Sequence, residues 1–173
     1  MRFWLALFLL VLFSFAPARA DVVDGAFDHA IAQFERALPQ LPKRLFGVDV
    51  ATYRAALTFR KFTGDHWGGT TSLSVENGSE AEASCARYAA FVRLPPSNGR
   101  VSLVLCPQFS TPGADALRRL TILHELVHVV AGPDECRAMA FAARVEQAAT
   151  GSFTDVGNYW RANNCSGSGF ALP

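Results

Sequence analysis

The sequence predicts a small α+β domain in which a mixed or antiparallel sheet precedes a long helix and a helical C-terminal part. Short runs of alternating or β-branched residues, separated by turn signals, occupy residues 53–107. Longer segments with apolar residues at helical spacing follow, and neither a repeat nor a linker divides the chain. A length of 173 residues is enough for one such domain with a buried core.

Residues 1–20 have the pattern of a secretory signal peptide. A basic residue, Arg2, precedes an unbroken apolar run over residues 3–13, and the small-residue pattern Ala18-Arg19-Ala20 closes the segment. We therefore expect cleavage after this segment and a single domain over residues 21–173. The apolar run is short for a membrane-spanning helix. We expect a secreted or periplasmic protein with no membrane association after cleavage.

The charge pattern argues against nucleic acid as a partner. Arg2 and Arg19 would leave with the signal peptide, so 14 of the 16 basic residues remain beside 15 acidic residues. The basic residues are scattered along the chain and form no block that could neutralise a row of phosphates.

Four cysteines lie in the predicted mature chain, and an even number in an exported protein favours two disulfides. Three pairings are possible. We favour Cys85 with Cys106 and Cys136 with Cys165, because each pair closes a short loop within one half of the fold. A zinc site made of all four cysteines is the rival hypothesis, which the lack of a CxxC spacing disfavours.

The first helix of the mature chain is expected over residues 24–38, where apolar residues recur at helical spacing, and it should end before Pro39. His29 lies on this helix with no second metal-type ligand one turn away. We interpret His29 as an ordinary surface or packing residue.

The next part of the chain reads as strands. Residues 81–93 fit a helix and a strand equally well. Turn signals occur at Asn77-Gly78 and at Pro95 to Gly99. The expected strands lie within residues 55–62, 70–75 and 99–106.

The most specific motif is HELVH, residues 124–128, on a helix that should begin near Thr111-Pro112 and end at Gly132-Pro133. His124 and His128 lie one helical turn apart, so both rings can converge on one Zn²⁺ ion at about 2.0–2.1 Å. Glu125 lies beside them at a different angle, as a general base for zinc-activated water would. The motif therefore predicts a zinc-dependent hydrolase.

A catalytic zinc needs a third protein ligand, and Glu135 is our choice. It opens a second helix, expected over residues 134–149, directly after the turn. If the two helices pack antiparallel, Glu135 lies a few ångströms from the level of the histidines, whereas Glu146 overshoots it by roughly 12 Å. Asp134 and His66 are further candidates, and His66 could instead donate a hydrogen bond to an oxyanion.

The segment HELVHVVAGPDECRAMAFAARVE resembles zincin metallopeptidases of the gluzincin type, and the resemblance covers about residues 112–150. It implies a zincin-like domain that hydrolyses peptide bonds in a peptide or protein substrate. It also implies that the strand at residues 101–105 aligns an extended substrate by β-augmentation. Known gluzincins usually place their Glu ligand farther downstream than the seven positions between His128 and Glu135.

Two other classes of function stay open. The chain could be a non-catalytic zinc-binding module, or a disulfide-stabilised binding module in which the HELVH histidines are merely buried. Two further residues have alternative roles. Asp155 would orient a histidine ligand or cap a short C-terminal helix, and Tyr159 would stabilise an oxyanion or pack with Trp160 against the core.

Overall fold

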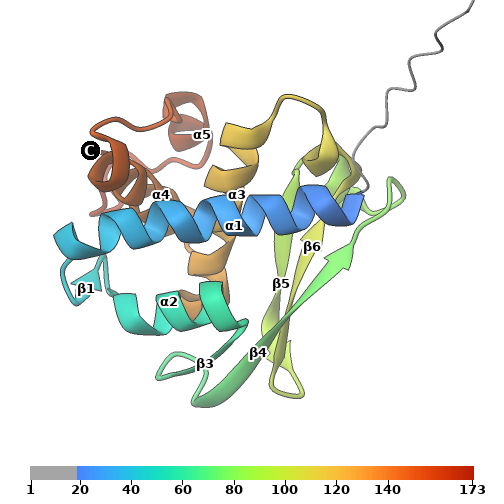
Figure 1. Cartoon of the computed structure of the whole chain (residues 1–173), viewed down its shortest axis with the longest axis horizontal. Coiled ribbons are helices and arrows are strands. Elements are labelled where there is room, and N and C mark those ends of the chain that lie inside the picture. The colour runs from blue at the N-terminus through green and yellow to red at the C-terminus, as the bar shows by residue number, and fades with distance from the viewer. Residues whose placement is uncertain (1–18) are drawn as a thin grey trace, which may run out of the picture.

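The computed structural model describes residues 19–173, and this part of the chain forms an α+β domain with five α-helices and two sheets. The predicted fold class, a mixed sheet followed by a helical C-terminal part, is confirmed (Figure 1). Residues 1–18 lie outside the described part, so the signal peptide stays a prediction. None of the helices within residues 19–173 combines the length and the hydropathy that crossing a membrane requires.

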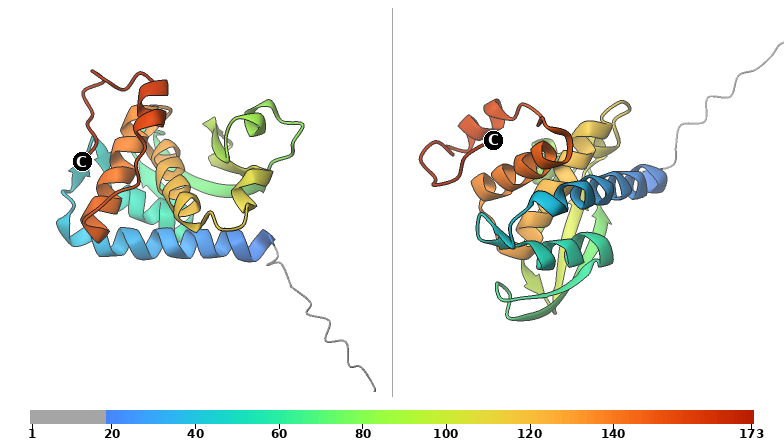
Figure 2. Two further views of the ribbon diagram at one scale, coloured as in Figure 1. Left: turned by 90° about the horizontal axis from the view of Figure 1, so that it is seen from above. Right: turned by 60° about the vertical axis from the view of Figure 1, so that its left-hand side comes forward.

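The first helix, α1 (Arg19–Ala37), runs along one side of the domain and contacts α3 and α4 (Figure 1, Figure 2). It begins earlier than expected but ends before Pro39, as predicted, where the 3-10 turn η1 (Leu38–Gln40) follows. Phe34 is fully buried on its inner face. His29 is exposed, in agreement with the expectation of an ordinary residue.

The strand expected over residues 55–62 is wrong for most of its length, because helix α2 (Val50–Phe59) occupies it. The Asp49 carboxylate caps this helix by accepting a hydrogen bond from the Thr52 N–H, at 2.8 Å. A short apolar run does not separate helix from strand by its period alone. The buried residues of α2 recur at helical spacing: Val50, Tyr53, Ala56 and Leu57.

The main sheet has the strand order β3-β4-β6-β5, with β4 and β6 parallel and the other neighbours antiparallel. The strands expected within residues 70–75 and 99–106 are confirmed as β4 and β6. The strands of this sheet are β3 (Lys61–Gly64), β4 (Gly69–Asn77), β5 (Ala90–Ser97) and β6 (Arg100–Leu105), and a separate hairpin consists of β1 (Arg44–Leu45) and β2 (Val48–Asp49).

The ambiguous segment, residues 81–93, contains both kinds of structure. The 3-10 turn η2 (Ala83–Ala86) occupies its middle, and β5 begins at Ala90. β5 continues through Pro95 and Pro96, which were expected in a turn, and the chain reverses only at Asn98-Gly99, where both residues have positive φ. Proline is tolerated in β5 because this strand lies at the edge of the sheet.

The helical C-terminal part begins later than expected. The motif helix starts at Asp115 and not near Thr111-Pro112, because a 3-10 turn precedes it and Gly113 adopts a φ of +78°. Its expected end at Gly132-Pro133 is confirmed, because the last helical residue is Ala131 and Gly132 is the C-cap. The elements of this part are η3 (Pro107–Ser110), α3 (Asp115–Ala131), α4 (Glu135–Thr150) and α5 (Gly157–Ala162).

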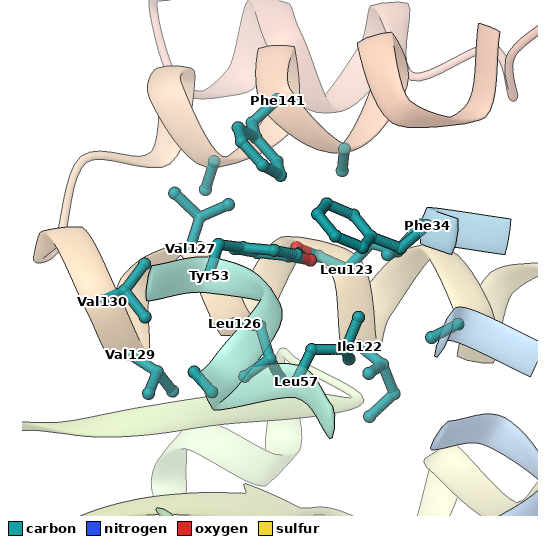
Figure 3. Packing of buried hydrophobic residues seen from close by; sticks show 14 of the residues in the cluster. Phe34, Tyr53, Leu57, Ile122, Leu123, Leu126, Val127, Val129, Val130 and Phe141 are labelled. Atoms are coloured by element: carbon teal, nitrogen blue, oxygen red, sulfur yellow. Dashed lines mark hydrogen bonds between the residues drawn. The ribbon is translucent and has the colours of Figure 1, made fainter. Parts of the chain in front are cut away.

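Helix α3 lies at the centre of the domain and contacts α1, α2, α4, β5 and β6. Tyr53 of α2 packs between Phe34 and Phe141, with ring centroids 4.9 and 4.5 Å away (Figure 3). Its hydroxyl donates a hydrogen bond to the Leu123 carbonyl of α3, at 2.8 Å. A helix enclosed in this way holds its side chains in defined positions.

Both favoured disulfides are confirmed, and each has a Cα–Cα distance of 5.3 Å. Cys85–Cys106 joins η2 to the end of β6. Cys136–Cys165 joins the first turn of α4 to the segment that follows α5. Each disulfide therefore ties an irregular segment to an element of the core.

Candidate metal centre

The two histidines of the HELVH motif face the same point, as predicted from their spacing. His124 and His128 are each only 5% exposed, and their Nε2 atoms lie 3.1 Å apart. Helix α3 positions both rings because its neighbouring turns are buried in the core.

Glu135 joins the histidines from the first turn of α4. Its Oε2 atom lies 3.0 Å from His124 Nε2 and 3.4 Å from His128 Nε2. The tight turn between the helices brings it there: Gly132 has a φ of +87°, and the Asp134 carboxylate caps α4 by accepting a hydrogen bond from the Arg137 N–H, at 2.9 Å. The three residues that we predicted as metal ligands thus form one group.

The geometry of this group fits a metal ion. In a tetrahedral site with bonds of 2.0–2.1 Å, neighbouring ligand atoms lie about 3.3 Å apart. The separations between the two nitrogens and the oxygen are 3.0, 3.1 and 3.4 Å. The buried His-His-Glu group could therefore hold a metal ion.

The ring of His128 has the tautomer that a metal ligand needs. Its Nδ1 lies 2.9 Å from the carbonyl oxygen of Gly132. A carbonyl only accepts hydrogen bonds, so Nδ1 carries a proton, and whenever the ring is neutral its Nε2 presents a lone pair. His124 differs, because its buried Nδ1 has no hydrogen-bond partner among residues 19–173.

Tyr159 adds a contact that the sequence did not predict. Its hydroxyl, carried by α5, donates a hydrogen bond to Glu135 Oε2 at 2.5 Å. The side chain is also partly buried against the core, as expected. Residues 135 and 159 are 24 positions apart, and no local pattern joins them.

Charge at the group favours a cation. Burial acts to lower the pKa of His128, but Glu135 and Glu125 outweigh burial and raise it. Burial alone would raise the pKa of Glu135, yet hydrogen bonds with His124, His128 and Tyr159 hold it well below its usual range. Positive charge is therefore stabilised beside an ionised carboxylate.

Glu125 lies in the same cleft but outside the three-atom group. It is only 7% exposed. Burial raises its pKa, although the positive charge of the nearby histidines acts in the opposite direction. A carboxylate beside the His-His-Glu group and not within it could accept a proton from a molecule held there.

The other candidate ligands lie elsewhere. The Asp134 carboxylate is the helix cap described above. Glu146 Oε2 accepts a hydrogen bond from the Thr154 N–H, at 2.8 Å. Asp155 Oδ1 accepts one from the Gly157 N–H, at 2.9 Å, but the N-cap of α5 is Val156, so Asp155 lies one residue before the cap position that we expected it to fill. His66 packs against Gly132 and lines a different pocket.

The cleft beside the group is bordered by β5, which corrects one expectation. The strand at residues 101–105, now β6, is paired on both sides and has no free edge for a substrate. β5 is the edge strand, and Ala90 and Val92 line a cleft of about 140 Å³ together with Glu125, His128 and Glu135.

The register of the sheet shows which groups of β5 face this cleft. The Ala89 carbonyl accepts a hydrogen bond from the Cys106 N–H, at 2.9 Å, and Ala90 pairs with Leu105. Hydrogen-bonded and non-hydrogen-bonded pairs alternate along an antiparallel ladder. The backbone N–H and C=O groups of Ala90 and Val92 therefore point away from β6, toward the open edge.

Comparison of the chain with protein-family models, with curated proteins and with solved structures found no match.

Proposed function

We propose that this protein is an exported zinc-dependent hydrolase that cleaves peptide bonds. The observation that carries the proposal is the near-equilateral group of His124 Nε2, His128 Nε2 and Glu135 Oε2, with the Glu125 carboxylate beside it. Two imidazoles and one carboxylate are a ligand set of catalytic zinc sites.

Three protein ligands favour a catalytic site over a structural one. Structural zinc sites are closed by four protein ligands, whereas catalytic sites keep one position open. Within residues 19–173 the group has three such residues. The non-catalytic zinc-binding module is therefore the weaker hypothesis.

In the proposed reaction His124, His128 and Glu135 hold the ion, which when bound supplies Lewis acidity for a scissile carbonyl and for water. Glu125 accepts the proton of the attacking water at its carboxylate and returns it to the leaving amine. Because the Glu125 side chain is buried, this proton stays within the cleft. Tyr159 and the Gly132 carbonyl hold two of the ligands in orientation.

The edge of β5 supports a peptide as the substrate. An extended peptide can pair with the open N–H and C=O groups of Ala90 and Val92, in the manner of an added strand. This pairing would place its backbone beside Glu125 and the metal group, which line the same cleft. The two disulfides support an oxidising location, either secreted or periplasmic.

The decisive experiment compares Glu125→Gln with the native protein and with Asp134→Asn as a matched control. Zinc content is measured by mass spectrometry, and cleavage is measured on an unfolded protein and a quenched peptide library. Glu125→Gln should keep one zinc per chain and lose activity by about 10²–10⁴-fold. Asp134→Asn should keep both the bound zinc and the activity, because Asn also caps helices. Unchanged cleavage by Glu125→Gln would refute the mechanism.

A further inference from the structure

A second, larger pocket of about 370 Å³ opens next to the metal cleft. Most of its inner surface is apolar, with Leu120, Met139 and Val156 all buried, while His124 and Glu125 line the side that faces the metal cleft. Three helical segments and the start of β5 form its walls. A volume of this size is at the lower end of the range for small-molecule sites, roughly 300–1,000 Å³.

The mouth of this apolar pocket exposes hydrophobic side chains to water. Leu117 and Tyr88 are 58% and 46% exposed, and they are two of only three large hydrophobic residues that are exposed within residues 19–173. Leu117 also lies on the helical stripe that continues through Thr121 to His124. Exposed apolar surface gathered at one cavity is typical of a binding site.

The apolar pocket is continuous with the metal cleft, the cleft of about 140 Å³ that β5 borders beside the His-His-Glu group. Tyr88, Ala90, Glu125 and Tyr159 line both spaces. A peptide extended along the open edge of β5 would therefore pass the metal group and reach the mouth of the pocket at Ala90. Successive side chains of such a peptide point to opposite sides, so one of them can enter the pocket.

We infer that the apolar pocket binds one large aliphatic or aromatic side chain of the peptide, next to the bond that is cleaved. This inference rests on the proposed function and names its substrate class. Two of the charged lining residues, Arg87 and Asp155, are exposed, while the buried His124 and Glu125 lie on the side that faces the metal cleft. The part of the pocket formed by Leu120, Met139 and Val156 offers no partner for a buried charge. Charged side chains are therefore disfavoured there.

The test fills the pocket without disturbing the core. Thr121 is half-buried and lines the pocket, whereas Ala116 lies on the same helix, is exposed and lies outside it. Cleavage sites are first mapped in a peptide library, and then kcat/KM is measured on peptides that carry Leu, Phe or Ala at the preferred position. The native protein should favour Leu or Phe over Ala by about 10–200-fold.

Thr121→Phe should lower kcat/KM for the Leu and Phe peptides by at least about 10-fold and change it for the Ala peptide by less than about threefold. Ala116→Phe should leave kcat/KM unchanged for all three peptides. Leu117→Ser, which replaces an exposed side chain and spares the fold, should also reduce the preference. Equal cleavage of all three peptides, or an unchanged preference in both Thr121→Phe and Leu117→Ser, would overturn the inference.

Binding separates this inference from the proposed function. Fluorescence anisotropy measures the affinity of zinc-loaded Glu125→Gln for the labelled Leu, Phe and Ala peptides. Tighter binding of the Leu and Phe peptides supports the pocket even if the native protein cleaves none, a result that would refute the peptidase proposal alone. Cleavage without any preference refutes the pocket alone, and equal binding of all three peptides also counts against it.

Discussion

At the scale of single residues, the candidate site depends on how Glu135 Oε2 is held. This oxygen meets two imidazole nitrogens and the hydroxyl of Tyr159. The hydrogen bond from Tyr159 orients the carboxylate, much as the Gly132 carbonyl orients the ring of His128. Tyr159 is thus a positioning residue that acts through Glu135.

Tyr159→Phe should weaken zinc binding by about 10–100-fold, because the carboxylate loses the group that orients it. The zinc dissociation constant is measured by competition with a chromophoric chelator, and circular dichroism checks the fold. Tyr88→Phe is the matched control, since within residues 19–173 the Tyr88 hydroxyl makes no hydrogen bond to the His-His-Glu group. Equal dissociation constants for Tyr159→Phe and the native protein would contradict this role.

At the scale of elements, each disulfide ties one wall of the candidate site to the core. Cys136–Cys165 connects the residue after Glu135 to the segment that follows α5, the helix that carries Tyr159. Cys85–Cys106 fixes η2, which leads to Tyr88 and β5. Cys136–Cys165 therefore supports the His-His-Glu group, and Cys85–Cys106 supports the side of the cleft that β5 borders.

Removing the two disulfides should have different effects. Cys136→Ala with Cys165→Ala, and Cys85→Ala with Cys106→Ala, should each lower the free energy of unfolding by about 3 kcal/mol, because their loops have similar lengths. Only the loss of Cys136–Cys165 should also weaken zinc binding, since this loss releases α5. Urea unfolding measures the free energy of unfolding, and chelator competition measures the zinc affinity. An equal loss of zinc affinity in both variants would argue against a specific role of Cys136–Cys165 in the site.

At the scale of the whole molecule, the His-His-Glu group joins α3 and α4, the two long helices of the C-terminal half. α3 contributes both histidines, and α4 contributes Glu135. An ion held between them would bind the folded chain and not the unfolded one, so metal binding would be coupled to folding.

Zinc should therefore raise the melting temperature. Free zinc at 100 times its dissociation constant adds about 2.7 kcal/mol, which corresponds to roughly 5–10 °C for a domain of this size. Differential scanning fluorimetry with zinc, and then with excess chelator, measures the shift and its reversal. Glu135→Gln should show little shift, and an unchanged melting temperature of the native protein would contradict metal binding at this group.

Local patterns predicted a large part of this structure. The strands β4 and β6 and both disulfide pairs agree with the expectations, because turn residues and loop lengths act locally. The pattern at residues 55–62 predicts a strand where the second half of helix α2 lies, because this apolar run is short and the packing of Tyr53 against Phe34 and Phe141 is a long-range contact. The edge position of β5 likewise depends on strand order, which a one-dimensional pattern does not contain.

The sequence by itself determined that two imidazoles and a carboxylate lie close together on one helix, because the 3.6-residue period places His124 and His128 on one face with Glu125 beside them. It also determined that Glu135 follows directly after a glycine turn. Only the tertiary structure decided that Glu135, and not Glu146 or His66, meets the histidines, that Tyr159 holds it, and that β5 borders the cleft. These contacts join distant segments, and the packing of α3, α4, α5 and the sheet creates them.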